Sequence, residues 1–121
     1  EAYGILEKMK FLLTRRAIFD LEKIYKYSRE HWGEKQSDEY LDKLYEVFHF
    51  LAGNPELGKI WQHRAAPFYM FPAGSHFVVY DLIDDQVIII TILHGKQNIE
   101  KFVEYMKPEF LLDIEEIKRN L

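Results

Sequence analysis

The sequence predicts an α+β domain, in which an antiparallel sheet of about four strands is covered on one face by an N-terminal αα-hairpin. The first observation is a pair of strand-like runs, residues 77–83 and 86–94, which are rich in β-branched and aromatic side chains. The second is a pair of amphipathic helical patterns earlier in the chain, separated by only a short break. Together they indicate a single domain over residues 1–121.

The two runs at residues 77–83 and 86–94 predict a β-hairpin. Asp84 and Asp85 lie between them, and aspartate tolerates the left-handed backbone that a two-residue turn requires. This turn pairs Tyr80 with Ile89 and Phe77 with Ile92. Strict alternation then places Leu93 on the same face as Tyr80, and Ile92 on the opposite face. Because both faces are apolar, we expect the hairpin to lie inside the sheet and to be covered on both sides.

The αα-hairpin is predicted from two stripes of apolar residues. Residues 11–13 form a short strand, after which Thr14 can cap a helix that ends near Gly33. A second helix over residues 35–52 ends at Gly53-Asn54-Pro55. The sheet is the only large apolar surface that these helices can cover. The stripes consist of Leu21, Ile24, Tyr25, Ser28 and Trp32 in the first helix, and of Leu41, Leu44, Tyr45, Phe48 and Leu51 in the second.

The remaining segments are a loop, a short strand and a helical C-terminus. Residues 55–67 are loop-like, and residues 68–71 form a strand before Pro72. We expect a helix over 99–106 that Pro108 breaks, and then a last helix over 108–121. Residues 103–121 thus form a C-terminal helical extension. Its apolar face should cover the second face of the sheet, or swap onto a neighbouring molecule. That face consists of Phe110, Ile114, Ile117 and Leu121.

Composition limits the classes of protein to which the chain can belong. Its 121 residues contain no cysteine, which excludes disulfides and thiolate chemistry and agrees with a reducing, cytoplasmic location. The formal net charge of −4 does not suggest a surface that binds nucleic acid throughout. The sequence has no motif for a metal or a cofactor, and we expect neither. Met9 resembles a natural start, so residues 1–8 are expected to be a cloning remnant or an extension.

Two groups of side chains are candidates for chemistry or binding. His76 and His94 are brought to one end of the hairpin, where a histidine pair could act as general acid and base or could bond loop carbonyls. Trp61, Arg64 and Tyr69 belong to an aromatic stretch that could stack RNA bases or could close one end of the core. The residues alone leave both alternatives open.

A strand, a helical hairpin and an antiparallel meander follow one another in the predicted order of elements, and short motifs recur along them. The motifs are Ala17, Asp20-Leu21, Ile24 and Tyr27; Trp32-Gly33; Tyr40-Leu41 and Leu44; Leu51-Ala52 and Asn54-Pro55-Glu56-Leu57-Gly58; Phe71-Pro72-Ala73-Gly74-Ser75-His76 with Tyr80; and Leu93-His94. In this order of elements and in these motifs, over about residues 9–102, the chain resembles the ParE/RelE superfamily of bacterial toxin–antitoxin (plasmid stabilisation) systems, and is closer to its ParE branch.

The resemblance implies a cytoplasmic bacterial toxin that inhibits DNA gyrase without catalysis and is neutralised by a ParD-like antitoxin. A homodimer or a toxin–antitoxin hetero-oligomer would be its assembled form. The alternative is a RelE-like, ribosome-dependent mRNA endoribonuclease, which would use His94, His76, Lys96 and Tyr69 as catalytic residues. The expected binding residues are Trp61, Arg64, Tyr69, His76, His94 and Lys96.

The chain departs from the ParE pattern at several positions where arginine is common. Tyr69, Ser75 and Asp81 occupy three of these positions, and Gln97-Asn98 stands where the family often has Arg-Asp. A third interpretation is therefore a non-toxic, degenerate relative that is kept for binding alone. Many ParE chains also end soon after the position of Lys101, whereas this chain continues to Leu121.

Overall fold

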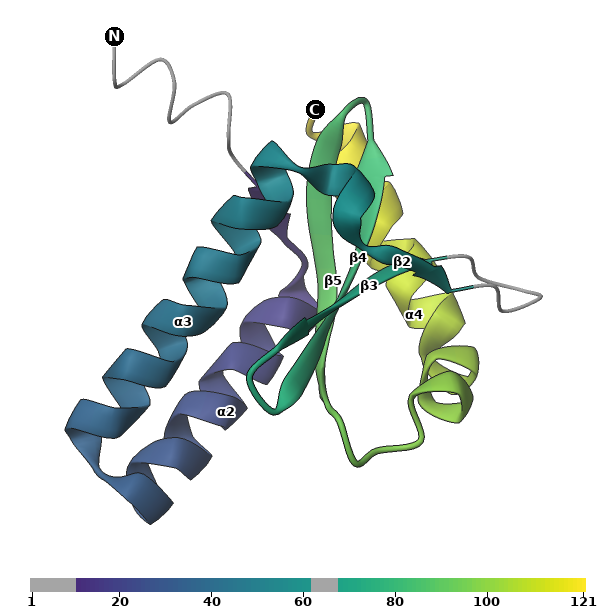
Figure 1. Ribbon diagram of the computed structural model, residues 1–121. Helices are drawn as coiled ribbons and strands as arrows, with labels where there is room; N and C mark the ends of the chain where they lie inside the picture. The colour runs from purple at the N-terminus through teal and green to yellow at the C-terminus, as the bar shows by residue number, and fades with distance from the viewer. Residues whose placement is uncertain (1–10, 62–67) are drawn as a thin grey trace, which may run out of the picture.

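A computed structural model describes residues 11–61 and 68–121 (Figure 1). Within these ranges, one sheet lies between two helical layers. The sheet has five strands in the order β1-β5-β4-β3-β2, namely β1 (Phe11–Leu13), β2 (Lys59–Trp61), β3 (Phe68–Ala73), β4 (His76–Ile83) and β5 (Gln86–His94). The helices are α2 (Arg15–Trp32), α3 (Glu34–Gly53) and α4 (Ile99–Arg119), with a 3₁₀ turn at Pro55–Leu57. The predicted α+β class, with an N-terminal helix pair and a C-terminal helix, is confirmed.

The sheet differs from the prediction at its two edges. The pairs β5–β4, β4–β3 and β3–β2 are antiparallel, whereas β1 runs parallel to β5. β2 is the additional strand beyond the predicted four. It lies in the segment predicted as a loop, and its three residues are too few to show an alternating pattern.

The turn between β4 and β5 is the predicted two-residue turn. Asp84 has φ 51° and Asp85 has φ 64°, both in the left-handed region that this kind of turn requires. The predicted pairing of Tyr80 with Ile89 is confirmed. Phe77, however, pairs with Leu93 and not with Ile92, so the prediction is wrong by one residue at the far end of the hairpin.

A β-bulge explains this shift. Val79 pairs with Thr91 while the next residue of β4 pairs with Ile89, so Ile90 is an extra residue in β5. The alternation of faces therefore resets after Ile90. Ile92 joins the core beneath α2 and α3, and Leu93 joins the core beneath α4, which is the reverse of the prediction. The sequence gives no sign of the bulge because β5 is apolar at almost every position.

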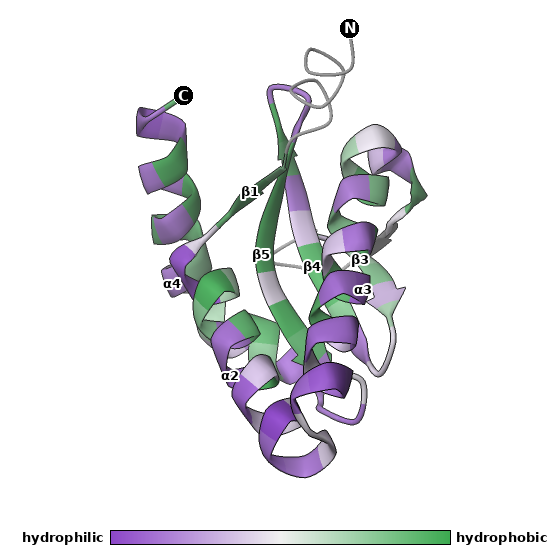
Figure 2. Cartoon of the chain, turned by 90° about the vertical axis from the view of Figure 1, so that its left-hand side faces the viewer, coloured by the Kyte–Doolittle hydropathy of each residue, from purple (hydrophilic) through white to green (hydrophobic). Residues whose placement is uncertain are grey.

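The α2–α3 hairpin covers one face of the sheet (Figure 1). Thr14 caps α2 as predicted, with its hydroxyl accepting from the amide of Ala17 at 3.1 Å. The hairpin turns at Gly33, whose φ of 89° favours glycine. Figure 2 shows the polar outer surfaces of both helices and the apolar strands behind them.

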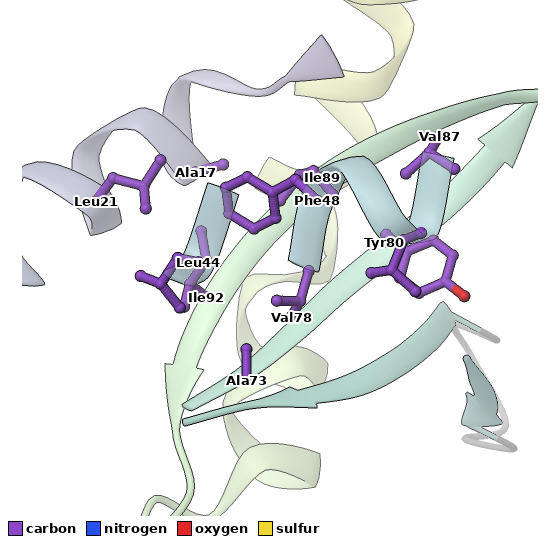
Figure 3. Packing of buried hydrophobic residues seen from close by; sticks show 11 residues of the cluster. Ala17, Leu21, Leu44, Phe48, Ala73, Val78, Tyr80, Val87, Ile89 and Ile92 are labelled. Atoms are coloured by element: carbon purple, nitrogen blue, oxygen red, sulfur yellow. The ribbon is translucent and has the colours of Figure 1, made fainter. Parts of the chain in front are cut away.

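The first core lies between this hairpin and the sheet. Leu44 and Phe48 of α3 and Val78 of β4 have no exposed surface, and Figure 3 shows them packed together with Tyr80 and Ile89. Burial of each such aliphatic or phenyl side chain contributes about 1.5–3 kcal/mol.

Asp20 joins α2 to β5 inside this layer. Its carboxylate accepts a short hydrogen bond from the Thr91 hydroxyl, another from the amide of Ile92 at 3.1 Å, and one from Arg16 Nε at 3.0 Å. Burial raises the pKa of Asp20, although these hydrogen bonds and the Arg16 charge act in the opposite direction. Asp20 therefore links α2 to β5 by hydrogen bonds inside the core.

α4 covers the second face of the sheet, as predicted for the C-terminal segment. The prediction of two helices separated at Pro108 is wrong, because α4 is continuous and contains Pro108. Val103, Met106, Phe110 and Ile114 recur at helical spacing on both sides of the proline, and all four are buried against the sheet. Pro108 itself is exposed, so its missing N–H falls on the solvent side, and the buried face holds the helix together.

Candidate functional site

A cleft of about 610 Å³ lies where the α2–α3 hairpin extends past the ends of the strands. Its helical wall includes Ile24, Tyr27 and Trp32 of α2. Its floor is formed by the β3–β4 turn and the end of β5. The polar floor residues are Tyr40, Ser75, His76 and His94.

The floor is organised by the hydroxyl of Tyr40, which reaches from α3 to the β3–β4 turn. Tyr40 Oη lies 2.5 Å from His76 Nδ1 and accepts a hydrogen bond from the amide of Ser75 at 3.1 Å. It also lies 3.1 Å from Ser75 Oγ. Gly74, with φ 60°, brings the turn so close that a Cβ there would lie 2.7 Å from the same hydroxyl. The turn and α3 are therefore fixed to one another.

His76 is held as a neutral imidazole. Burial, with the like charge of His94 as the second cause, lowers the pKa of His76 from 6.5 to about 4. A neutral ring can accept a proton at Nδ1, so the Tyr40 hydroxyl can donate to it across the 2.5 Å contact. At neutral pH His76 is thus a positioned hydrogen-bond acceptor and a weak base, and it lacks the imidazolium form that a general acid requires.

His94 lies directly opposite His76 in the β4–β5 ladder, with 5.2 Å between the ring centroids. The predicted register, which pairs Phe77 with Ile92, would place His94 opposite Ser75, and the bulge in β5 accounts for the one-residue difference. The amide of Lys96 donates to His94 Nδ1 at 3.1 Å, so a neutral His94 carries its proton on Nε2. The predicted histidine pair therefore exists, and Lys96 is next to it in the turn that leaves β5.

The structure places Tyr69 away from this pair. Tyr69 pairs with Tyr80 in the β3–β4 ladder, and the two rings stack with 5.2 Å between their centroids. Tyr69 lies four positions before Ala73, the residue that pairs with His76, which corresponds to about 13 Å along a strand. The four residues of the ribonuclease alternative thus fall into two places, and their catalytic role stays a prediction.

Two predicted binding residues cannot be located as side chains. Trp61 ends β2, and its backbone pairs with Phe68, but its side chain lies outside the described part of the structure. Arg64 and residues 1–8 also lie outside the described residues. The binding roles of Trp61 and Arg64 remain predictions.

The sequence did not single out most of the cleft. Trp32 belongs to the apolar stripe of α2, yet its side chain is 63% exposed. The apolar stripe continues along α2 past the end of the sheet. Trp32 therefore lines the cleft and does not pack in the core. Tyr27, which is 59% exposed, lies in the same overhang. No signal in the sequence indicates this cleft, because α2, with 18 residues or about 27 Å, is no longer than β5, with 9 residues or about 30 Å, and the overhang depends on how the elements are placed.

Comparisons with known proteins agree with the resemblance in sequence. The family model described as "ParE toxin of type II toxin-antitoxin system, parDE" matches residues 11–99. Toxin ParE1 of Caulobacter vibrioides is 33% identical over 88 residues, which is 73% of this chain and 91% of that protein. Toxin ParE1 of Mycobacterium tuberculosis is 26% identical over 93 residues, covering 76% and 95% of the two chains.

A solved structure, described as "Chromosomal ParDE TA system from P. aeruginosa", shares the fold. It aligns with a TM-score of 0.62 at 16% identity, over 72% of this chain and 96% of that one. The family match begins at β1 and continues through the whole sheet, ending as α4 begins. The chain therefore belongs to the ParE toxin family of type II toxin–antitoxin systems.

Proposed function

We propose that this toxin inhibits DNA gyrase, blocks replication, and is neutralised by a ParD-like antitoxin. The observation that carries the proposal is the extent of the family match, which includes both helices of the hairpin and all strands of the sheet. The proposal implies a cytoplasmic location and a toxin–antitoxin hetero-oligomer as the resting form. It involves no catalytic step by the toxin itself.

The charge of the sheet favours inhibition by binding over cleavage of RNA. Residues 68–94, which form β3, β4 and β5, contain no lysine or arginine. Phosphoryl chemistry needs preorganised positive charge where the transition state becomes more negative. His76 is neutral, and Tyr69 is stacked on Tyr80 away from the histidine pair. These features support a toxin whose surface, and not its chemistry, acts on the target.

The test combines a purified assay with growth. The full chain is added to DNA gyrase in a supercoiling assay, and it is expressed from an inducible promoter in bacteria that carry a DNA-damage reporter. Loss of supercoiling and induction of the reporter, with intact transcripts, are the expected results. Co-expression with a ParD-like antitoxin should restore growth.

Matched histidine variants separate this proposal from ribonuclease action. His94→Ala alters the cleft floor, whereas His49→Ala alters an exposed residue of α3 outside the cleft. Cleaved transcripts that disappear in His94→Ala and persist in His49→Ala would assign the toxin to the ribonuclease alternative. Normal growth together with unaffected gyrase would identify a non-toxic relative and overturn the proposal.

A further inference from the structure

The first turn of α2 carries two arginines at the end of the helix where positive charge is unfavourable. Arg15 and Arg16 are its first two residues, and residues 15–18 include no aspartate or glutamate. The free N–H groups at the N-terminus of a helix give it a partial positive charge, so cations there are repelled and acidic groups are attracted. The favourable contacts of the two arginines lie instead in another element, α4.

Both arginines reach across to α4. Arg15 Nη2 lies 2.6 Å from Glu116 Oε1, and the guanidinium of Arg16 lies over the ring of Phe102, 5.3 Å from its centroid. The side chain of Arg16 is 22% exposed, and removal of water strengthens a cation–π contact. Phe102 and Glu116 are fourteen positions apart, which is about 21 Å along a straight helix. The first turn of α2 therefore holds α4 at two distant points.

Asp113 of α4 makes a third contact with this turn. Partial burial raises the pKa of its carboxyl group, whereas the backbone N–H of Arg16 and the charge of Arg15 lower it. A carboxylate beside the N–H groups of a helix N-terminus is the arrangement that α2 lacks within its own first turn. α4 supplies this negative charge. The three contacts, Arg15 with Glu116, Arg16 with Phe102 and Asp113 with the N–H of Arg16, form the latch of α4.

The helical state of α4 depends on its docking. Pro108 interrupts the hydrogen bonds of the helix, and most of the stability of a helix in a protein comes from the packing of its apolar face. Residues 95–98 connect α4 to β5, and the family match ends at residue 99. Undocking and loss of helix should therefore occur together, in a unit separate from the part of the chain that matches the family.

Apolar packing and the latch contribute differently to the docked state. The buried face, which includes Phe110 and Ile114, provides most of the attraction to the sheet, but this attraction has no direction and does not depend on charge. The latch is directional, and its ionic contacts are weakened when salt screens them. The latch thus fixes the position of α4 and makes its docking sensitive to ionic strength.

We propose that α4 is a strap that opens and closes as one unit over the second face of the sheet, and that the latch on α2 holds it closed. Opening uncovers Val79, Ile88 and Ile90, which have no exposed surface in the closed form. A contiguous apolar surface of this kind becomes a site of association once water reaches it. The latch therefore controls access to this face, and this control does not depend on gyrase being the target.

Amide hydrogen exchange of the full chain, followed residue by residue by NMR, tests the proposal. After correction for intrinsic rates, the amides of α4 should share one opening constant, at least about tenfold larger than that of the slowest amides of the sheet. Raising sodium chloride from about 0.05 M to about 0.5 M should increase the opening constant of α4 about threefold relative to α3, because salt screens the latch. The α3 amides report on the stability of the rest of the domain.

Substitutions in the latch locate the contacts that hold the strap. Arg15→Glu and Glu116→Arg each place like charges opposite one another and should increase the opening constant of α4 about fivefold, whereas the double variant should return it to within about twofold of the wild type. Asp113→Ala should increase it about tenfold. Glu109→Ala removes an exposed carboxylate of α4 outside the latch and should change it by less than about twofold. Unchanged exchange of α3 verifies that each variant is folded.

Three outcomes would overturn the proposal. Equal opening constants for α4 and the slowest amides of the sheet would show that α4 opens only when the whole domain unfolds. Failure of the double variant to restore slow exchange would show that Arg15 and Glu116 do not act as a pair. Equal effects of Asp113→Ala and Glu109→Ala would show that the contact with α2 is unimportant. Gyrase inhibition is measured separately, so either conclusion can fail while the other stands.

Discussion

The pKa of His76 links the floor of the cleft to the stability of the fold. Burial and the neighbouring His94 lower this pKa to about 4, while the unfolded chain has the ordinary value of 6.5. The folded state therefore binds fewer protons than the unfolded state between these two values. The free energy of unfolding must fall as the pH drops through this window.

This linkage predicts the behaviour of His76→Gln. The side chain of glutamine can still accept a hydrogen bond from Tyr40, but it does not titrate. Because the ring is only half-buried and solvent screens part of the effect, the wild type should lose about 1–2 kcal/mol relative to the variant between neutral pH and about pH 4. Urea denaturation at a series of pH values measures the difference, with His49→Gln as the control at an exposed position. Parallel profiles for wild type and His76→Gln would show that His76 is not buried as described.

The hydrogen bonds of Asp20 also contribute to the free energy of unfolding. Asp20→Ala leaves the Thr91 hydroxyl and the Ile92 amide buried without their acceptor. The free energy of unfolding should decrease by about 2–4 kcal/mol. Asp42→Ala removes a carboxylate from the exposed face of α3 and should change it by less than about 0.5 kcal/mol. Denaturant unfolding of both variants at neutral pH is the measurement.

At the scale of elements, α4 is the largest departure from what its sequence predicted. Proline inside a helix normally marks a break, because it lacks an N–H and its ring clashes with the preceding turn. In α4 the apolar positions on both sides of Pro108 pack onto one continuous sheet face. Tertiary packing has overridden the local signal, and no property of the segment alone could have shown that.

The buried face of α4 predicts which substitutions the helix tolerates. Phe110 is fully buried beneath the sheet, whereas Leu112 is 71% exposed on the same helix. Phe110→Ala should lower the free energy of unfolding by about 3–5 kcal/mol through lost burial and the cavity that remains. Leu112→Ala should change it by less than about 1 kcal/mol. Equal effects of the two substitutions would mean that α4 does not lie on the sheet in solution.

Pro108 allows the opposite prediction, a gain in stability. Pro108→Ala restores an N–H inside the helix and removes the clash of the ring, at an exposed position. The proline also restricts the unfolded chain, which offsets part of the gain. The net increase should be about 1–2 kcal/mol, measurable as a higher denaturant midpoint. An unchanged or lower midpoint would indicate that the stability of α4 depends on Pro108 itself.

At the scale of the whole molecule, the sequence predicts the layers well and the cleft poorly. The hairpin of β4 and β5, its turn at Asp84, the cap at Thr14 and the two covered faces follow from local patterns of polarity and turn chemistry. The cleft follows from how the elements are placed, since α2 and α3 extend past the ends of the strands although they are about as long as β4 and β5 (Figure 1). Such an offset exists only after the elements are assembled.

The existence of the histidine pair could be predicted from the sequence, but its exact register could not. Its existence was predictable from the hairpin, but its register depends on the bulge at Ile90, within a run of apolar residues that would suit either face. The separation of Tyr69 from the pair also depends on counting residues along paired strands. Strand registers of this kind can be determined only from the three-dimensional structure.

The short connection between β5 and α4 affects how easily another helix can replace α4 on the second face of the sheet. Only Gly95–Asn98 joins the two elements, so α4 remains close to the sheet face even when it detaches. A tethered helix of this kind has an effective concentration in the millimolar range. A free helix with equal affinity for that face would need a similar concentration to displace it. The second face of this toxin is thus occupied by its own chain, and a partner of ordinary abundance that binds this face no more tightly than α4 does will not displace the helix.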